Sequence, residues 1–264
     1  MASPEQVDWY DTPLFYDIVF DGDSPAEGAF LEAVHREYGR GNRSKRSVIE
    51  PACGSGRLLL EMAKRGWSVA GFDANFQMLD FARKRMKGNG QRGTIWEDRM
   101  ESFRVPRNRK FDLAHCLVSS FKYLLTESHA EACFQGVADC LKPGGVFALG
   151  LHMTDYDNLR VTHERWVDSR DGVKVVSNTR TWPADVERRI EPIRSRLKIT
   201  FPDGEERFQE THWEARTYSA SELRALVARV PEFELVACHD FRYDMEERRE
   251  LDDSYEDIIL ILRK

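Results

Sequence analysis

The middle of the chain alternates short apolar runs with amphipathic segments. The apolar runs consist mostly of Val, Ile, Leu, Phe and Ala, which is typical of parallel strands buried on both faces. The segments between them carry apolar residues at helical spacing, as in helices that cover a sheet. The pattern therefore predicts an α/β fold with helices on both faces of a largely parallel sheet. The predicted strands are 47–50, 68–72, 93–96, 111–118 and 146–151, and the predicted helices are 57–65, 76–86 and 128–141.

The pattern changes between residues 160 and 216. Apolar and polar residues alternate there, and turn sequences such as RDGV (170–173) and FPDGEE (201–206) separate the stretches. The ranges 194–201 and 207–216 are predicted to be the two arms of a hairpin. We interpret 160–216 as a small antiparallel β-sheet inserted into the α/β domain.

The α/β pattern resumes after the insertion. The sequence SASE (219–222) is a capping box that opens a predicted helix at 220–229. Two further strands are predicted at 233–241 and 257–262, which brings the expected main sheet to seven strands.

The first part of the chain is expected to be helical. Ser24 is the predicted N-cap of a helix with Pro25 at its first position. The aromatic segment 9–20 either packs on the core or closes over a pocket. The predicted parts of the chain are an N-terminal helical cap (1–45), one α/β domain (46–159 and 217–264) and the inserted sheet (160–216).

Charge and composition narrow the classes of partner. The chain has 264 residues and a formal net charge of -6, and its acidic surface should repel nucleic-acid backbones. The basic run RGNRSKR (40–46) is the local exception, and a solvated loop is the favoured interpretation over a binding patch.

Cysteine usage indicates a reducing compartment. The 5 cysteines form no CxxC pair and their number is odd, which favours free thiols over a disulfide framework or a metal site. The first residues lack the basic and apolar regions of a signal peptide, and no apolar run reaches the roughly 18 to 20 residues of a membrane span. We expect a cytoplasmic protein, monomeric or homodimeric, that holds no metal.

The first predicted strand ends in a loop of small residues, PACGSG (51–56). Ala52, Gly54 and Gly56 let a ligand approach the backbone closely, and the following helix points its first amides at that ligand. The second predicted strand ends at Asp73, whose carboxylate can accept two hydrogen bonds from a ribose diol. Because ligands of open parallel sheets bind beyond the carboxyl ends of the strands, these features predict a ligand that contains a ribose.

Two kinds of cofactor match this outline. A dinucleotide expects G-x-G-x-x-G with the third glycine one turn into the helix. Here Ala52 occupies the first position and Gly56 comes too early. Glu50, just before the loop, is unfavourable beside a pyrophosphate and favourable beside an ammonium group. A ligand with a ribose and an ammonium group is therefore favoured, and a nicotinamide-dependent oxidoreductase remains the alternative.

Four stretches together resemble the motifs of class I S-adenosylmethionine-dependent methyltransferases of the small-molecule type. The resemblance implies a Rossmann-like sheet of seven strands with S-adenosylmethionine at the glycine loop. It also implies transfer of a methyl group to a nitrogen or oxygen of a small molecule, with S-adenosylhomocysteine as product. A domain that binds the cofactor without catalysis is a second alternative. The four stretches are EPACGSG (50–56), GFDAN (71–75), KFDLAHCLVSSFKYLLT (110–126) and LKPGGVFAL (141–149).

The resemblance assigns cofactor-binding roles by position. Asp73 would hold the ribose hydroxyls, and Glu50 would lie near the methionine amino group. In relatives an acid just before a Met takes the adenine amino group. Here Asp98 is one residue early and Arg99 precedes Met100, and we assign the role to Asp98. The remaining assigned residues shape the loop, flank the adenosine or contact the methionine part: Ala52, Cys53, Gly54, Gly56, Asn75, Phe76, Met100 and Leu117.

Substrate-side residues are harder to predict, because methyl transfer from a sulfonium requires alignment and exclusion of water more than a fixed set of catalytic groups. His152 follows the fifth strand and is our candidate general base, with a structural histidine as the alternative. Tyr10 and Tyr16 lie in the aromatic segment and Tyr123 follows the fourth strand, so each can line a pocket or pack.

Strand alternation near the end of the insertion places residues on two faces. His212, Glu214 and Arg216 would share one face and Trp213 the other. We predict that His212 and Arg216 contribute to the substrate side, although an ordinary sheet surface explains them as well.

Overall fold

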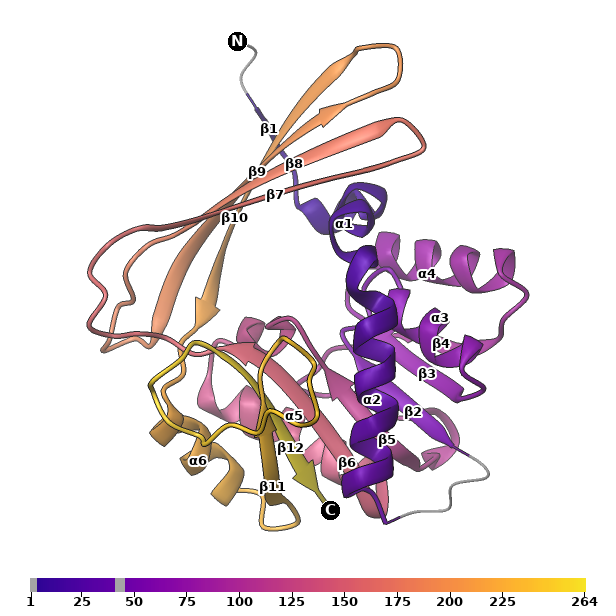
Figure 1. Cartoon of the computed structure of the whole chain (residues 1–264), viewed down its shortest axis with the longest axis vertical. Helices are drawn as coiled ribbons and strands as arrows, with labels where there is room; N and C mark the ends of the chain where they lie inside the picture. The colour runs from indigo at the N-terminus through magenta and orange to yellow at the C-terminus, as the bar shows by residue number, and fades with distance from the viewer. Residues whose placement is uncertain (1–3, 41–45) are drawn as a thin grey trace.

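Two β-sheets organise the molecule (Figure 1). The computed structural model describes residues 4–40 and 46–264. A seven-stranded sheet with helices on both faces forms the larger body, and a five-stranded sheet projects from it. The α/β fold class and the presence of a second, small sheet are confirmed. Most of the predicted basic loop, residues 41–45, lies outside the described residues.

The seven-stranded sheet has the order β11-β12-β6-β5-β2-β3-β4. Neighbouring strands from β6 to β4 are parallel, and β12 is antiparallel to both of its neighbours. The chain moves outward from β2 through β3 to β4 and then returns to the other side of β2 at β5. The crevice of this sheet therefore lies at the carboxyl ends of β2 and β5. The strands are β2 (Ser47–Pro51), β3 (Ser68–Asp73), β4 (Gly93–Glu97), β5 (Phe111–Cys116), β6 (Leu141–His152), β11 (Glu234–His239) and β12 (Asp257–Arg263).

Helices cover both faces of this sheet. Successive residues of β2 point to opposite sides, so that Val48 joins one apolar cluster and Ile49 the other. The first cluster packs under α2 (Ser24–Tyr38), α3 (Arg57–Lys64) and α4 (Phe76–Gly88), and the second under α5 (Glu127–Cys140) and α6 (Ala220–Ala228). The predicted capping box is confirmed, because Ser219 and Glu222 exchange both hydrogen bonds at the start of α6.

The predicted N-cap of α2 is wrong. The helix begins at Ser24 itself, and the preceding residue, Asp23, makes no side-chain cap. The Ser24 hydroxyl instead accepts a hydrogen bond of 3.1 Å from the buried Arg57. A tertiary contact has therefore replaced the local cap that the sequence suggested.

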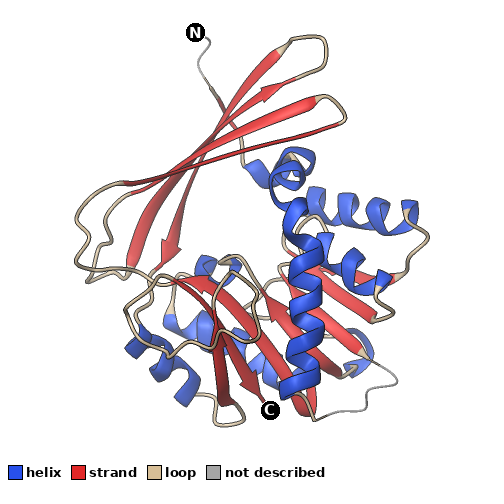
Figure 2. Ribbon diagram, in the orientation of Figure 1, coloured by secondary structure: helices blue, strands red, loops and turns tan. Residues whose placement is uncertain are grey.

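The second sheet has the order β1-β10-β9-β8-β7. Four of its strands pair antiparallel in chain order, as predicted for an antiparallel sheet between 160 and 216, and β9 and β10 are the two arms of the predicted hairpin. The fifth strand comes from the start of the chain and pairs in parallel with β10, which the sequence did not indicate. Figure 2 shows these strands rising away from the helix-covered body. The strands are β1 (Glu5–Gln6), β7 (Thr162–Arg170), β8 (Val173–Thr181), β9 (Ile190–Thr200) and β10 (Glu206–Arg216).

The aromatic segment near the N-terminus lies between the two sheets. It forms the 3-10 turn η1 (Trp9–Asp11), the helix α1 (Pro13–Phe20) and the turn η2 (Asp21–Asp23). Apolar residues of α1, among them Phe15 and Ile18, pack against Val175, Leu197 and Ile199 of the five-stranded sheet. No helix in the described part of the chain is long and apolar enough to cross a membrane.

Candidate active site

The glycine loop has an unusual backbone. Ala52, Gly54 and Gly56 all have left-handed backbone angles, with φ of 53°, 50° and 71°. Because every second residue of the loop has left-handed angles, the backbone turns sharply between β2 and α3. The Gly54 amide donates to Asp73 Oδ2 at 2.8 Å, so the loop and the end of β3 are held together.

The two glycines are required for different reasons. A Cβ atom on Gly56 would lie 2.8 Å from the Cβ of Ala82, so α4 packs directly on this position. A Cβ on Gly54 would meet only Tyr16, at 4.0 Å. Gly54 therefore faces open space, which leaves its backbone accessible to a ligand.

A cavity of about 340 Å³ opens in front of the loop and Asp73. We call it the glycine-loop cavity. It lies at the carboxyl ends of β2 and β3, and it contains six of the predicted cofactor-binding residues. These are Ala52, Gly54, Asp73, Asn75, Asp98 and Met100.

Asp73 is oriented before any ligand arrives. Its two carboxylate oxygens accept hydrogen bonds from the backbone amides of Gly54 at 2.8 Å and Asn75 at 2.9 Å. Burial raises the pKa of Asp73, while the hydrogen bonds from Asn75 and Gly54 oppose that shift. The Asn75 side chain caps α4 through Met78 and donates to Asp11 at 2.8 Å, so it supports the rim of the cavity.

The far end of the glycine-loop cavity is formed by the turn after β4. Asp98 accepts hydrogen bonds from the backbone amides of Arg99 and Arg104, both at 2.9 Å. This carboxylate thus holds the turn in place and also lines the cavity. Phe76, expected beside the adenosine, has 63% of its surface exposed and does not line the cavity.

A nook of about 20 Å³ continues the cavity behind the loop. Glu50, Cys53 and Leu117 line it together with Ala52 and Gly54. Each predicted cofactor-binding residue of the loop therefore lines one of these cavities, except Gly56. Gly56 has no side chain, and this lets α4 pack directly against the loop.

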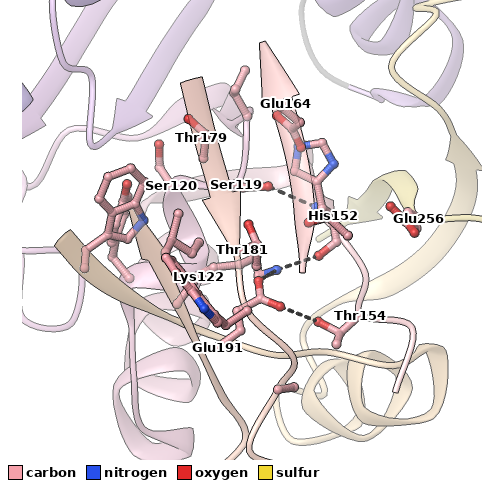
Figure 3. A pocket seen from close by; sticks show the side chains of 18 of the residues that line it. Ser119, Ser120, Lys122, His152, Thr154, Glu164, Thr179, Thr181, Glu191 and Glu256 are labelled. Atoms are coloured by element: carbon pink, nitrogen blue, oxygen red, sulfur yellow. Dashed lines mark hydrogen bonds and ion pairs between the residues drawn. The ribbon is translucent and has the colours of Figure 1, made fainter. Parts of the chain in front are cut away.

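A second cavity of about 210 Å³, the sheet cavity, lies under the five-stranded sheet (Figure 3). Its walls combine aromatic rings, hydroxyl groups and carboxylates from both sheets and from the N-terminal segment. The aromatic rings belong to Trp9, Tyr10, Tyr16, Phe20, Tyr123, Trp166, Trp182 and Trp213, the hydroxyls include Ser119, Ser120, Thr179 and Thr181, and the carboxylates are Asp155, Glu164, Glu191 and Glu256.

Two residues line all three spaces, namely the glycine-loop cavity, the nook and the sheet cavity. Tyr16 of α1 and Ser120 of the turn η4 (Ser120–Tyr123) line the glycine-loop cavity, the nook and the sheet cavity alike. Tyr10 and Tyr123 border both larger cavities, and their hydroxyl groups are 2.6 Å apart. Burial raises the pKa of all three tyrosines, which remain neutral phenols.

His152 lies at the end of β6 and lines the sheet cavity. Its Nδ1 is 2.7 Å from Oδ1 of Asp257, the first residue of β12, because the two residues are direct partners across the strands. The His152 amide donates to the Ser119 hydroxyl at 2.9 Å. The sequence did not indicate Asp257 as a partner, since the pairing depends on strand register.

A buried ion pair forms part of the sheet cavity wall. Lys122 Nζ donates to Glu191 Oε1 at 2.6 Å and to the His152 carbonyl at 3.0 Å (Figure 3). Glu191 comes from β9 and was not among the predicted residues. Its alternation with Ile193, which also faces the cavity, is the sequence signal that marks it.

His212 and Arg216 do not line any of these spaces. His212 is directed to Glu210, with Nε2 2.8 Å from Oε1, and Arg216 forms an ion pair of 2.6 Å with Glu127. The inward face of β10 instead carries Trp213, which stacks on Trp9 with ring centroids 5.3 Å apart. The alternation is as predicted, but Trp213, and not His212 or Arg216, faces the sheet cavity. Within the described residues, no group of three or more His, Cys, Asp or Glu is placed to hold a metal ion.

Comparison with known proteins identifies the part of the chain that carries the loop. Residues 48–145 match the family model described as methyltransferase domain. This segment is therefore similar to methyltransferase domains. It includes the glycine loop, Asp73 and Asp98, whereas the N-terminal segment and the five-stranded sheet lie outside the matched range.

Solved structures agree with this match. A crystal structure of an S-adenosylmethionine-dependent methyltransferase from Clostridium acetobutylicum superposes with a TM-score of 0.73, at 16% identity, over 97% of this chain and 98% of that one. The chain thus has the methyltransferase fold over nearly its whole length. The resemblance drawn from the four motifs is confirmed.

Two of the curated relatives are named as an N,N-dimethyltransferase and an O-methyltransferase. One is the dTDP-3-amino-3,4,6-trideoxy-alpha-D-glucopyranose N,N-dimethyltransferase of Streptomyces venezuelae, 34% identical over 38% of this chain and 40% of its own. Another is a ubiquinone biosynthesis O-methyltransferase of Actinobacillus pleuropneumoniae, 31% identical over 38% of this chain and 43% of its own. The chain spans about half the length of the curated relatives it matches.

Proposed function

We propose that this protein transfers a methyl group from S-adenosylmethionine to a nitrogen or oxygen atom of a small molecule. The observation that carries the proposal is the meeting of the three spaces at Tyr16 and Ser120. A cofactor in front of the glycine loop and an acceptor under the five-stranded sheet would face each other at this junction.

The residues present fit S-adenosylmethionine. The oriented carboxylate of Asp73 would accept from the ribose hydroxyls, and the open backbone at Gly54 would let the ribose and sulfur approach closely. Asp98 and Met100 would border the adenine. Glu50, whose Oε2 has no partner within the described structure, would receive the amino group of the methionine part.

When bound, the cofactor supplies a methyl group on a positively charged sulfur, which is already activated for displacement. What the chain must add is alignment and the exclusion of water. Tyr16, Ser120 and the Tyr10–Tyr123 hydroxyl pair surround the junction between the two cavities. The three tyrosine rings would help to exclude water beside a bound acceptor, and their neutral phenols add no competing nucleophile.

The sheet cavity suits a small acceptor better than a macromolecule. Its volume of about 210 Å³ is that of a compact metabolite, and aromatic faces with a few hydroxyls and carboxylates are typical of such sites. The net charge of -6 gives no attraction for a nucleic acid. The cysteines of the described chain are free and buried, which accords with a reducing compartment such as the cytoplasm.

His152 would accept a proton from the acceptor atom at or before attack. Asp257 holds the imidazole through Nδ1, so the other ring nitrogen is left to act in the cavity. Replacing His152 with Ala should lower kcat for an acceptor that must lose a proton, by about 10²-fold to 10⁴-fold. Asp257→Asn should produce a smaller loss, and His163→Ala, at an exposed position outside the cavity, should have no effect. Unchanged turnover in His152→Ala would remove the general-base role.

The proposed function is tested by incubating the protein with S-adenosylmethionine and a panel of small amines, phenols and hydroxylated rings. Mass spectrometry then measures S-adenosylhomocysteine and acceptors heavier by one methyl group. We expect turnover with at least one class of acceptor. A protein that binds the cofactor and methylates no member of a broad panel would favour a non-catalytic binding domain.

A further inference from the structure

Glu50 is a buried acid without a full set of partners. It is the fourth residue of β2, only 8% of its surface is exposed, and its Oε2 accepts no hydrogen bond within the described structure. A buried carboxylate is costly when ionised unless a cation or several hydrogen bonds offset the loss of water. The structure must therefore either supply a positive charge to Glu50 or leave it protonated.

The arginine whose charge acts on Glu50, Arg57, is already engaged by another carboxylate. Arg57 of α3 donates to Glu27 from both terminal nitrogens, with Nη2 3.0 Å from Oε1, and it also donates to Ser24 at 3.1 Å. Tyr243 adds a further hydrogen bond of 3.0 Å to Glu27. The charge of Arg57 is thus largely offset by Glu27, and only its more distant field reaches Glu50.

The neighbouring histidine, His115, does not supply the missing positive charge. Nδ1 of His115 on β5 is 3.9 Å from Glu50 Oε1, and both ring nitrogens of His115 are buried without a hydrogen-bond partner. Burial, with the nearby charge of Arg57, lowers the pKa of His115 to about 3. The imidazole is therefore neutral at physiological pH and gives Glu50 no counter-charge.

The other groups around Glu50 are acidic or neutral. Asp73 of β3 is a second carboxylate, and Tyr16 of α1 and Cys53 of the loop are uncharged. Burial raises the pKa of Glu50 well above its ordinary value, and the charges of Glu27 and Asp73 raise it further. The charge of Arg57 and a hydrogen bond from the Leu59 backbone lower it but do not reverse the shift. Two further acids, Glu27 and Asp73, thus act on Glu50, and the charge of Arg57 opposes them. The nook that Glu50 lines is about 20 Å³, enough for one ammonium group or one water molecule.

We propose that Glu50 is protonated in the free protein and loses its proton to solvent when the ammonium group of the cofactor's methionine part enters the nook. The inference rests on the proposed function, because that function supplies the cofactor. An ammonium–carboxylate ion pair then replaces a neutral acid, and one proton leaves the protein for each cofactor bound. Release of S-adenosylhomocysteine would take one proton back.

The direction of the pH effect follows from this exchange. Below the pKa of Glu50 in the free protein, affinity should rise about tenfold for each pH unit, because binding releases one proton. Above that pKa, Glu50 is already ionised and affinity should become independent of pH. Product would therefore leave more readily as the pH falls.

The test is calorimetric titration of the whole protein with S-adenosylhomocysteine in two buffers of different ionisation enthalpy, phosphate and imidazole, near about pH 6. At this pH an α-amino group, with an ordinary pKa of about 8, is fully charged and contributes no proton of its own. The difference in measured heat gives the number of protons released. We expect close to one proton for the native protein and none for Glu50→Gln. Titration with 5′-methylthioadenosine, which lacks the amino-acid part, should release none from either protein.

Two outcomes would overturn the proposal: no proton release from the native protein, or equal release from Glu50→Gln. Failure of both ligands to bind the native protein would instead contradict the proposed function and the inference with it. Thermal unfolding of Glu50→Gln provides the folding control. Since the raised pKa of Glu50 makes the native protein lose stability as pH rises from the ordinary value to the folded one, the variant should lose less over that range. A steeper loss in the variant would also contradict a protonated Glu50.

Discussion

Gly54 and Gly56 share a left-handed backbone but have different neighbours. Alanine at Gly56 would place its methyl group against Ala82, so we expect a loss of roughly 2 kcal/mol or more in the free energy of unfolding. Alanine at Gly54 meets open space, so the backbone term of about 1 kcal/mol should dominate. Its methyl group should, however, weaken cofactor binding. Denaturant unfolding and S-adenosylhomocysteine titration separate the two effects, and equal losses of stability would contradict this assignment.

The residues of the glycine loop and of the adjoining strand ends were the easiest to predict. The glycine loop, Glu50 and Asp73 follow one another at strand ends, and their positions depend on local chain geometry alone. Asp257 and Glu191 could not be found in this way, because they reach the sheet cavity through strand register with distant partners. Their importance becomes visible only when β12 and β9 are placed.

At the scale of elements, the alternation of β10 separates two adjacent side chains. Trp213 faces the sheet cavity and stacks on Trp9, whereas His212 is directed to Glu210 outside it. Trp213→Ala should therefore raise KM for the acceptor several-fold or more, since aromatic contacts contribute roughly 0.5 to 1.5 kcal/mol beyond their buried area. His212→Ala, one residue away on the same strand, should leave KM unchanged. Steady-state kinetics with an acceptor from the panel measures both, and the reverse ranking would mean that the outer face binds the substrate.

Most helices and strands were predictable because the spacing of their apolar residues is strongly periodic. All five strands and three helices of the 47–151 pattern occur, with ends that shift by a few residues, and β6 is longer at its start than predicted. The short strand β1 was missed because two residues carry no periodicity, and its parallel pairing with β10 is a long-range contact. The start of α2 was misjudged because Arg57 takes the Ser24 hydroxyl.

At the scale of the whole molecule, one buried acid connects the glycine loop and α4 with the five-stranded sheet. Asp17 of α1 is fully buried and accepts from Ser55 of the glycine loop at 2.7 Å. It also forms ion pairs with Arg85 of α4 and, at 2.7 Å, with Arg170 of β7. The same carboxylate therefore contacts the cofactor side, the covering helix and the roof of the sheet cavity.

Asp17→Asn should loosen this connection. Arg85 and Arg170 would lose their buried counter-charge and keep only the half-exposed Asp21, so the free energy of unfolding should fall by roughly 3 kcal/mol. Hydrogen exchange should also accelerate in 13–20, because α1 loses its polar contacts to the glycine loop and to β7. Asp23→Asn, at an exposed position in the same segment, serves as the matched control. Native-like exchange of α1 in the Asp17 variant would show that apolar packing alone holds the helix.

The most direct test of the whole account is calorimetric titration with S-adenosylmethionine, with NADH as the control ligand and Asp73→Ala beside the native protein. The account predicts that the native protein binds S-adenosylmethionine and not NADH. It also predicts that the variant binds more weakly by roughly 1 to 3 kcal/mol, because charge-assisted hydrogen bonds to the ribose are lost. Binding of NADH in place of S-adenosylmethionine, or unchanged affinity in a folded Asp73→Ala variant, would contradict the account.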